Sequence, residues 1–238
     1  VPLWIGDQTV ERDRDILLEV PVGEHGRLVL LEARPGPARP ISARWAELGV
    51  PLADSEIFLE SKLLTRPVPA ALLYDSDRLP TNAARSEVRL EEGLGEVVHQ
   101  ARKELRELVA ATCAAFREAQ GERRETLRAA ILGWVGAHVG SAGWRRDLPT
   151  LDRDLVPFRD LPLVRNAVGR WVSLDRIADG PVLVSAEPES EELAPWLSSV
   201  LWVPPGDPSA ALLGGMPVPS PRKIVRDANR ALAARRRW

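Results

Sequence analysis

The stretch Tyr74–Val88, YDSDRLPTNAARSEV, marks the point where the chain changes from strand-like to helix-like patterns. An apolar run from Val68 to Tyr74 leads into it, and a long pattern of apolar residues at helical spacing follows it. Pro80 has no amide donor and biases the residue before it away from helical geometry. We therefore predict that the chain up to Asn82 is extended, and that the stretch is a stiff loop between a strand and a helix.

Two arginines in this loop are candidates for binding an anion, and an asparagine is a candidate for shaping the loop. Arg85 follows Asn82 by three positions, and a guanidinium on a stiff base can donate two parallel hydrogen bonds to a terminal phosphate. Arg89 comes one helical turn after Arg85, so in a helix both would face the same side. Asn82 is expected to shape the loop by capping the helix. The simpler alternatives are exposed arginines and an asparagine that serves only as a cap.

The loop resembles the catalytic loop in the middle domain of the ninety-kilodalton heat-shock chaperones, whose pattern reads Asp-Ser-x-x-Leu-Pro-Leu-Asn-x-Ser-Arg-Glu. The matching positions are Asp75, Ser76, Leu79, Pro80, Asn82 and Arg85. The departures, where the family has leucine, serine, glutamate and glutamine, are Thr81, Ala84, Ser86 and Arg89. The resemblance implies that Arg85 contacts the γ-phosphate of ATP, with Asn82 shaping the loop. ATP, with Mg, would be bound mainly by a separate N-terminal ATPase domain of the GHKL type.

On this resemblance we expect the middle domain of a divergent bacterial chaperone-like ATPase, which is not an enzyme by itself. Its expected partners are the N-terminal ATPase domain of the same protein, client proteins and a second copy in a homodimer of the intact protein. The expected location is the cytoplasm. Because the chain begins at Val1 rather than at Met, we expect it to be a piece of a longer protein.

The fold class expected from the whole chain is α+β or α/β, beginning with a mainly antiparallel sheet. Predicted strands are 1–5, 15–22, 27–33, 57–64 and 68–74, with a hairpin turn at 23–26 and a short helix at 43–48. Apolar residues at helical spacing predict two long helices, 91–119 and 122–139, separated at Gly121. We expect these helices to cover the apolar face of the sheet.

The rest of the chain predicts a smaller αβα subdomain. Buried strands are expected at 181–184 and 200–203, and short helices at 173–178, 190–197 and 208–213. This alternation is typical of a βαβ unit with parallel strands, and its order matches the segment that follows the long helices in the chaperone family. The expected divisions are residues 1–145, 146–221 and a basic helix or linker at 222–238.

Composition excludes several other classes of function. The net charge of −2 gives no overall attraction to nucleic acid or anionic membranes, and no apolar run is long enough to span a bilayer. The one cysteine, Cys113, excludes an internal disulfide and is expected to be a small buried hydrophobe. The three histidines, His25, His99 and His138, show no metal-ligand spacing, so no metal site is predicted. Asp75 and Asp77 are expected to accept local backbone amides.

Two alternatives remain open at this stage. The departures at Ser86 and Arg89 fit a protein-interaction scaffold that has lost its coupling to ATP. The basic segment 222–238 fits a nucleic-acid-binding helix, which is the less favoured alternative. Among the tryptophans, Trp134, Trp171 and Trp202 are expected in the core, while Trp4, Trp45, Trp196 and Trp238 include candidates for an exposed interaction surface.

Overall fold

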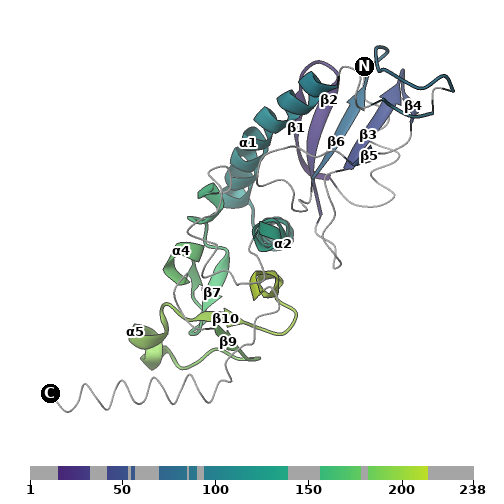
Figure 1. Ribbon diagram of the computed structural model, residues 1–238. Coiled ribbons are helices and arrows are strands. Elements are labelled where there is room, and N and C mark those ends of the chain that lie inside the picture. The colour runs from purple at the N-terminus through teal and green to yellow at the C-terminus, as the bar shows by residue number, and fades with distance from the viewer. Residues whose placement is uncertain are drawn as a thin grey trace. The chain divides into compact units, whose positions relative to one another are not determined.

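The computed structural model describes residues 16–32, 42–52, 55–56, 70–84, 86–89, 94–138, 156–177 and 182–213. The chain divides into two compact units, Val1–Ala137 and His138–Trp238, each with its own sheet (Figure 1). The mixed α+β class expected from the sequence is confirmed. The predicted strands at 1–5 and 57–64 and the basic segment 222–238 lie outside the described residues.

The first unit contains a six-stranded sheet. Its strands are β1 (Ile16–Val22), β2 (Gly26–Leu31), β3 (Ser42–Glu47), β4 (Val50–Pro51), β5 (Ser55–Glu56) and β6 (Ala70–Asp75). The order is β1-β2-β6-β3-β4, and β5 pairs with β3. All pairs are antiparallel except β3 with β6, which run parallel. The prediction of a mainly antiparallel sheet is therefore confirmed.

The helix predicted at 43–48 is wrong, because these residues form β3. Alanine and glutamate favour a helix locally, but a segment this short gains little stability as an isolated helix. In β3 the segment pairs instead with β6, where Ala43 lies opposite Leu72 and Trp45 opposite Tyr74. Trp45 becomes 1% exposed in this position, so it belongs to the core and not to an interaction surface.

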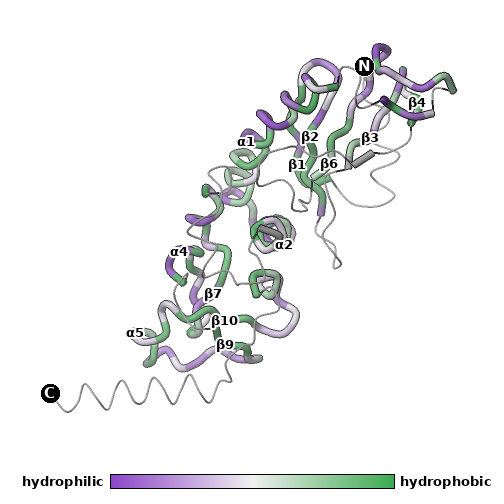
Figure 2. The backbone as a smooth tube through the Cα atoms, in the orientation of Figure 1, coloured by the Kyte–Doolittle hydropathy of each residue, from purple (hydrophilic) through white to green (hydrophobic). Residues whose placement is uncertain are grey.

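Strands β2 and β6 form the centre of the apolar core. Successive side chains of a strand point to opposite faces, yet Leu28, Val29, Leu30 and Leu31 are all buried, and so is the run 70–73. Figure 2 shows the hydrophobic character continuing along both strands. Both faces of this part of the sheet are therefore covered, which fixes the strand from which the loop departs.

Two helices follow the loop. Helix α1 (Gly95–Glu118) contacts β1 and β2, and its buried face contains Ala101, Leu105, Leu108, Val109, Thr112, Cys113 and Phe116. Helix α2 (Gly121–His138) reaches β1 through Arg123, whose guanidinium donates to the carbonyl oxygen of Leu17 at 2.5 Å. Gly121, at a positive φ of 53°, stands at the junction, as its sequence position predicted.

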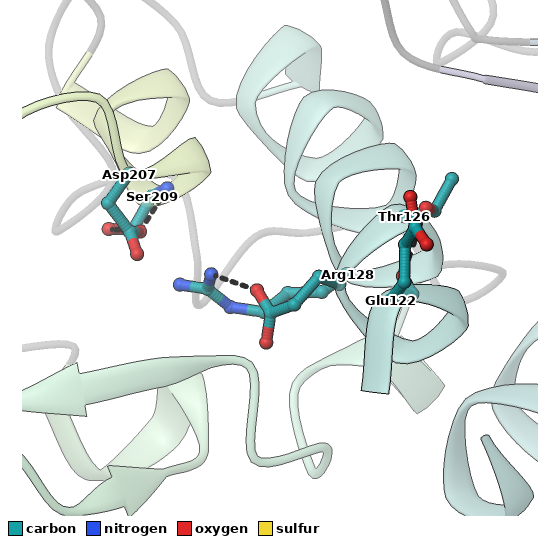
Figure 3. A network of polar contacts seen from close by, with 6 residues as sticks. Glu122, Thr126, Arg128, Asp207 and Ser209 are labelled. Atoms are coloured by element: carbon teal, nitrogen blue, oxygen red, sulfur yellow. Dashed lines mark hydrogen bonds and ion pairs between the residues drawn. The ribbon is translucent and has the colours of Figure 1, made fainter. Parts of the chain in front are cut away.

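Helix α2 carries polar contacts of its own within its first three turns. The Arg128 guanidinium donates to the Glu125 carboxylate at 3.0 Å, and the Thr126 hydroxyl donates to the carbonyl oxygen of Glu122 at 3.0 Å (Figure 3). Arg128 is only 2% exposed. A buried guanidinium is costly to leave uncompensated, so this carboxylate contributes to holding the charge within the fold.

The second unit contains a four-stranded sheet in the order β8-β7-β10-β9. Its elements are the 3-10 helix η3 (Val156–Phe158), β7 (Val164–Asn166), β8 (Trp171–Val172), α4 (Leu174–Ile177), β9 (Val182–Val184), η4 (Glu191–Leu193), α5 (Ala194–Leu197), β10 (Leu201–Val203) and η5 (Pro208–Leu213). Strands β9 and β10 are parallel, as the βαβ pattern predicted. Strand β7 is antiparallel to both β10 and β8, so the sheet is mixed and not wholly parallel.

Two short helices of this unit, η4 and η5, begin at side chains that accept backbone amides. The Ser190 hydroxyl accepts the amide of Glu192 at the start of η4, and the Asp207 carboxylate accepts the amide of Ser209 at 2.8 Å at the start of η5 (Figure 3). Such caps satisfy amides that have no partner within the helix. The single helix predicted at 190–197 is divided into η4 and α5.

Candidate functional site

The loop leaves the sheet at the end of β6 and is anchored there by backbone contacts. The amide of Asp75 donates to the carbonyl oxygen of His25 at 3.0 Å, and the amide of Ser76 donates to that of Ala46 at 3.1 Å. The Ser76 hydroxyl accepts the amide of Arg78 at 3.2 Å, which closes a small local turn. The first residues of the loop are therefore fixed to the β1–β2 turn and to strand β3.

The carboxylate of Asp75 makes a further contact over a long distance in sequence. Its Oδ1 accepts the amide of Gly49 at 3.1 Å. The expectation that Asp75 bonds a local amide is therefore wrong, because its partner lies on the β3–β4 hairpin. Asp77, in contrast, is exposed to solvent.

The middle of the loop folds back on itself as a short hairpin. Thr81 and Val88 form an isolated antiparallel bridge, and the amide of Arg89 donates to the carbonyl oxygen of Pro80 at 2.7 Å. Pro80 cannot donate, so only its carbonyl takes part in this pairing. Leu79 is 7% exposed and anchors the entry to the hairpin in the core.

A side-chain and backbone clasp closes the tip of this hairpin. Asn82 Oδ1 accepts the amide of Ser86 at 3.0 Å, and Asn82 Nδ2 lies 3.1 Å from the Ser86 hydroxyl oxygen, to which it donates. The amide of Asn82 donates to the carbonyl oxygen of Glu87 at 3.0 Å. Asparagine side chains often bond the backbone a few residues on in this way. Asn82 and Ser86 are thus joined to each other across the tip of the hairpin.

This geometry changes the predicted roles of Asn82 and Arg89. Asn82 shapes the loop, as expected, but it does not cap a helix, because α1 begins only at Gly95. Arg89 belongs to the paired segment of the hairpin, so the placement of Arg85 and Arg89 one helical turn apart is wrong. Arg85 itself lies outside the described residues.

Sequence reasoning missed the part played by Ser86. We treated it only as a departure from the glutamate of the chaperone pattern, whereas its amide and hydroxyl both contact Asn82. A signal was present in the chain, because Asn and Ser side chains four positions apart commonly bond each other or the backbone between them. A departure from the family pattern therefore contributes to the stiffness of the loop.

Aromatic residues pack at the root of the loop around Tyr74. Its ring meets those of Trp45 and His25 edge-on, at centroid distances of 5.9 Å and 6.3 Å. Burial raises the pKa of the Tyr74 phenol above its ordinary value, and the negative charge of Glu96 raises it further. The phenol therefore stays protonated at neutral pH, and the root of the loop is a packed platform without a titrating group at Tyr74.

The cysteine and the tryptophans considered in the sequence differ in how deeply they are buried. Cys113 is 3% exposed on α1, which confirms that it is a buried hydrophobe. Within the described part of the chain, no group of His, Cys, Asp and Glu residues could hold a metal ion. Trp134 and Trp202 are buried as predicted, but Trp171 is 39% exposed. It stacks with the Arg165 guanidinium, which lies 4.5 Å from its ring centroid.

Two comparisons with known proteins found no match for this chain. No model of a protein family matches it, and no curated protein matches it. None of the helices that the structure describes combines the length and apolar character required to cross a membrane.

Proposed function

We propose that this chain is the middle domain of a chaperone-like GHKL ATPase and that its loop delivers Arg85 to the γ-phosphate of ATP. ATP, with Mg, is held mainly by a separate N-terminal ATPase domain, and the chain also contacts client protein. The cytoplasm, which supplies ATP, is the compartment that this proposal implies. The single observation that supports it best is the clasp between Asn82 and Ser86, two residues that stand on either side of Arg85 in the sequence.

A closed turn suits this task because an arginine that acts on another domain must arrive in a defined geometry. The described backbone on either side of it is already ordered by the bridge between Thr81 and Val88 and by the clasp between Asn82 and Ser86. Less conformational entropy is then lost when the loop docks. The guanidinium of Arg85 would then stabilise the charge that develops on the transferred phosphoryl group, because a cation delivered from an ordered loop needs little reorganisation.

The resemblance of the loop sequence to the chaperone pattern supports the same assignment. The six matched positions include the two residues at the root of the loop, Asp75 and Ser76, and both make anchoring contacts. They also include Asn82, which forms the clasp. The matched residues are therefore those that set the shape of the loop, which is what the proposed role of Arg85 requires.

ATP turnover by the full-length protein tests the proposal. Replacing Arg85 by Ala is expected to lower kcat by at least about a hundredfold, since one preorganised donor in a transition-state site contributes that much. Arg85→Lys is expected to restore little, because a lysine lacks the planar fork of the guanidinium. Arg78→Ala is the matched control: Arg78 is an exposed arginine in the same loop, and its amide contact to Ser76 survives the substitution.

Equal turnover of Arg85→Ala and wild type, with both proteins folded by circular dichroism, would contradict the catalytic role. The non-catalytic interaction scaffold would then be the better account. A loss of turnover in Arg78→Ala as large as that in Arg85→Ala would also count against the proposal, because general loss of positive charge would explain both.

A further inference from the structure

The hairpin that contacts Asp75 has an unusual turn. Leu48 and Gly49 connect β3 to β4 as a two-residue turn, and their φ angles are 53° and 82°. Positive φ at both central residues is the mark of a type I′ turn, which normally contains Asn-Gly or Asp-Gly. Leucine is disfavoured in this conformation because of its Cβ. Leu48 is also 78% exposed, so packing within the described part of the chain does not account for it.

The hydrogen bond to Asp75 offers an explanation for the conformation of this turn. The amide of Gly49 donates to Asp75 Oδ1 at 3.1 Å, and the neighbouring carbonyl oxygen of Ala46 accepts the amide of Ser76 at 3.1 Å. The hairpin and the root of the loop are thus joined by two hydrogen bonds that run in opposite directions. One of them is a bond to a carboxylate, which is stronger than a bond between neutral groups.

We propose that Asp75 is a positioning residue for Arg85, which acts by tying the root of the loop to the Leu48–Gly49 turn. This inference rests on the proposed function of the loop. The carboxylate of Asp75 holds Gly49, while its own amide is held by the carbonyl of His25. Asp75 therefore joins two strand connections at the point where the chain leaves β6. Its contacts set the direction in which the loop departs, and through it the delivery of Arg85.

Asp77 provides a matched comparison within the same loop. It is also a carboxylate, it lies two positions further along the chain, and it is exposed. Removing it changes the net charge by the same amount as removing Asp75 but leaves the contact to Gly49 in place. A difference between the two variants therefore reports the hydrogen bond and not the charge.

Amide hydrogen exchange in the full chain tests the tie directly. Asp75→Ala is expected to speed exchange at Gly49, and at Ser86 and Arg89 within the hairpin of the loop, by about tenfold, the effect of losing one hydrogen bond to a charged group. Asp75→Asn retains an oxygen acceptor, although a neutral one, and is expected to exchange at rates between those of wild type and Asp75→Ala. Asp77→Ala is expected to exchange like wild type. Peptides from β2 should be unchanged in all variants, which shows that the sheet remains folded.

Two exchange results would overturn the inference. One is wild-type exchange at Ser86 and Arg89 in Asp75→Ala, since the root would then not control the loop. The other is equal acceleration in Asp75→Asn and Asp75→Ala, since the acceptor would then not be the cause.

ATP turnover supplies the functional readout. Asp75→Ala in the full-length protein is expected to lower kcat by about tenfold or more at an unchanged KM for ATP, because the nucleotide is bound elsewhere, and Asp75→Asn should restore kcat in part. Unchanged turnover in Arg85→Ala would defeat the proposed function, whereas the exchange result decides the tie between Asp75 and Gly49 by itself. Lost turnover in Arg85→Ala together with wild-type kcat in Asp75→Ala would defeat the positioning role alone.

Discussion

Replacing Leu48 by Asn is expected to stabilise the first unit, although it removes an apolar side chain. Leu48 has a φ of 53°, in the left-handed region that an L-residue with a bulky side chain disfavours. The penalty for that conformation is about 1–2 kcal/mol. Asparagine tolerates it far better, and Asn-Gly is the preferred sequence for a type I′ turn.

The loss of hydrophobic contact is smaller than this gain. Leu48 is 78% exposed, so only about a fifth of its surface is covered. Complete burial of a leucine side chain contributes about 1.5–3 kcal/mol, so the covered part contributes about 0.5 kcal/mol. The expected net effect of Leu48→Asn is therefore an increase of about 1 kcal/mol in the free energy of unfolding.

Urea denaturation read by hydrogen exchange in peptides from β2 and β6 measures this change in the sheet that carries the hairpin. Val50→Asn is the control, because Val50 is 62% exposed on the adjacent strand β4 and has no positive φ. It removes a similar apolar surface without relieving a left-handed residue, so it should not stabilise the sheet. Equal or lower stability of Leu48→Asn relative to wild type would refute the strain argument.

Three further predictions concern Gly26, Gly95 and the pKa of Tyr74. In Gly26→Ala the new Cβ would lie 2.8 Å from both Tyr74 Cδ2 and the carbonyl oxygen of Val22, so we expect a loss of about 1–3 kcal/mol in urea denaturation. Gly95→Ala, where a Cβ would meet nothing within 4 Å, should instead gain up to about 1 kcal/mol from helix propensity. Because the pKa of Tyr74 is raised in the folded chain, the unfolded chain loses the phenolic proton first as the pH rises. The free energy of unfolding is therefore unaffected by Tyr74 below pH of about 10, the ordinary pKa of tyrosine. It falls as the pH rises from there through the higher pKa of the folded state. Tyr74→Phe should remove that fall in stability. Since Tyr74 is the only tyrosine, phenolate absorbance reports its pKa directly. An ordinary pKa in the folded chain would contradict the burial argument.

Local patterns predicted the elements whose stability is local. The apolar spacing along 91–119 found α1, and the break at Gly121 and the pattern after it found α2. Strands bounded by turn signals, such as β1 and β2, were found for the same reason. The class of the fold could be predicted because each of these elements must bury one apolar face against another.

The errors have a common physical cause, which is pairing between residues far apart in sequence. Strand β3 was predicted as a helix because its composition favours one, but its partner β6 begins more than twenty residues later. The acceptor for the Gly49 amide is Asp75, at a separation of 26 positions. A single sequence contains no signal for such contacts, whereas the clasp between Asn82 and Ser86 spans four positions and could have been predicted.

The pairing within the loop also bears on how much conformational entropy the loop would lose on docking. Ordering the backbone of one residue costs about 1–2 kcal/mol, so an open loop would lose several times that amount on meeting an ATPase domain. In this chain the bridge between Thr81 and Val88 and the clasp between Asn82 and Ser86 order the backbone of these residues when the protein folds, so that this entropy is lost before docking. On the proposed function, docking would also cost the side-chain entropy of an arginine, about 2 kcal/mol, against which a charge-assisted contact with a phosphate would act. If the proposed function holds, this pairing would let the loop meet the ATPase domain with its hairpin already formed, so that the nucleotide would not have to order it.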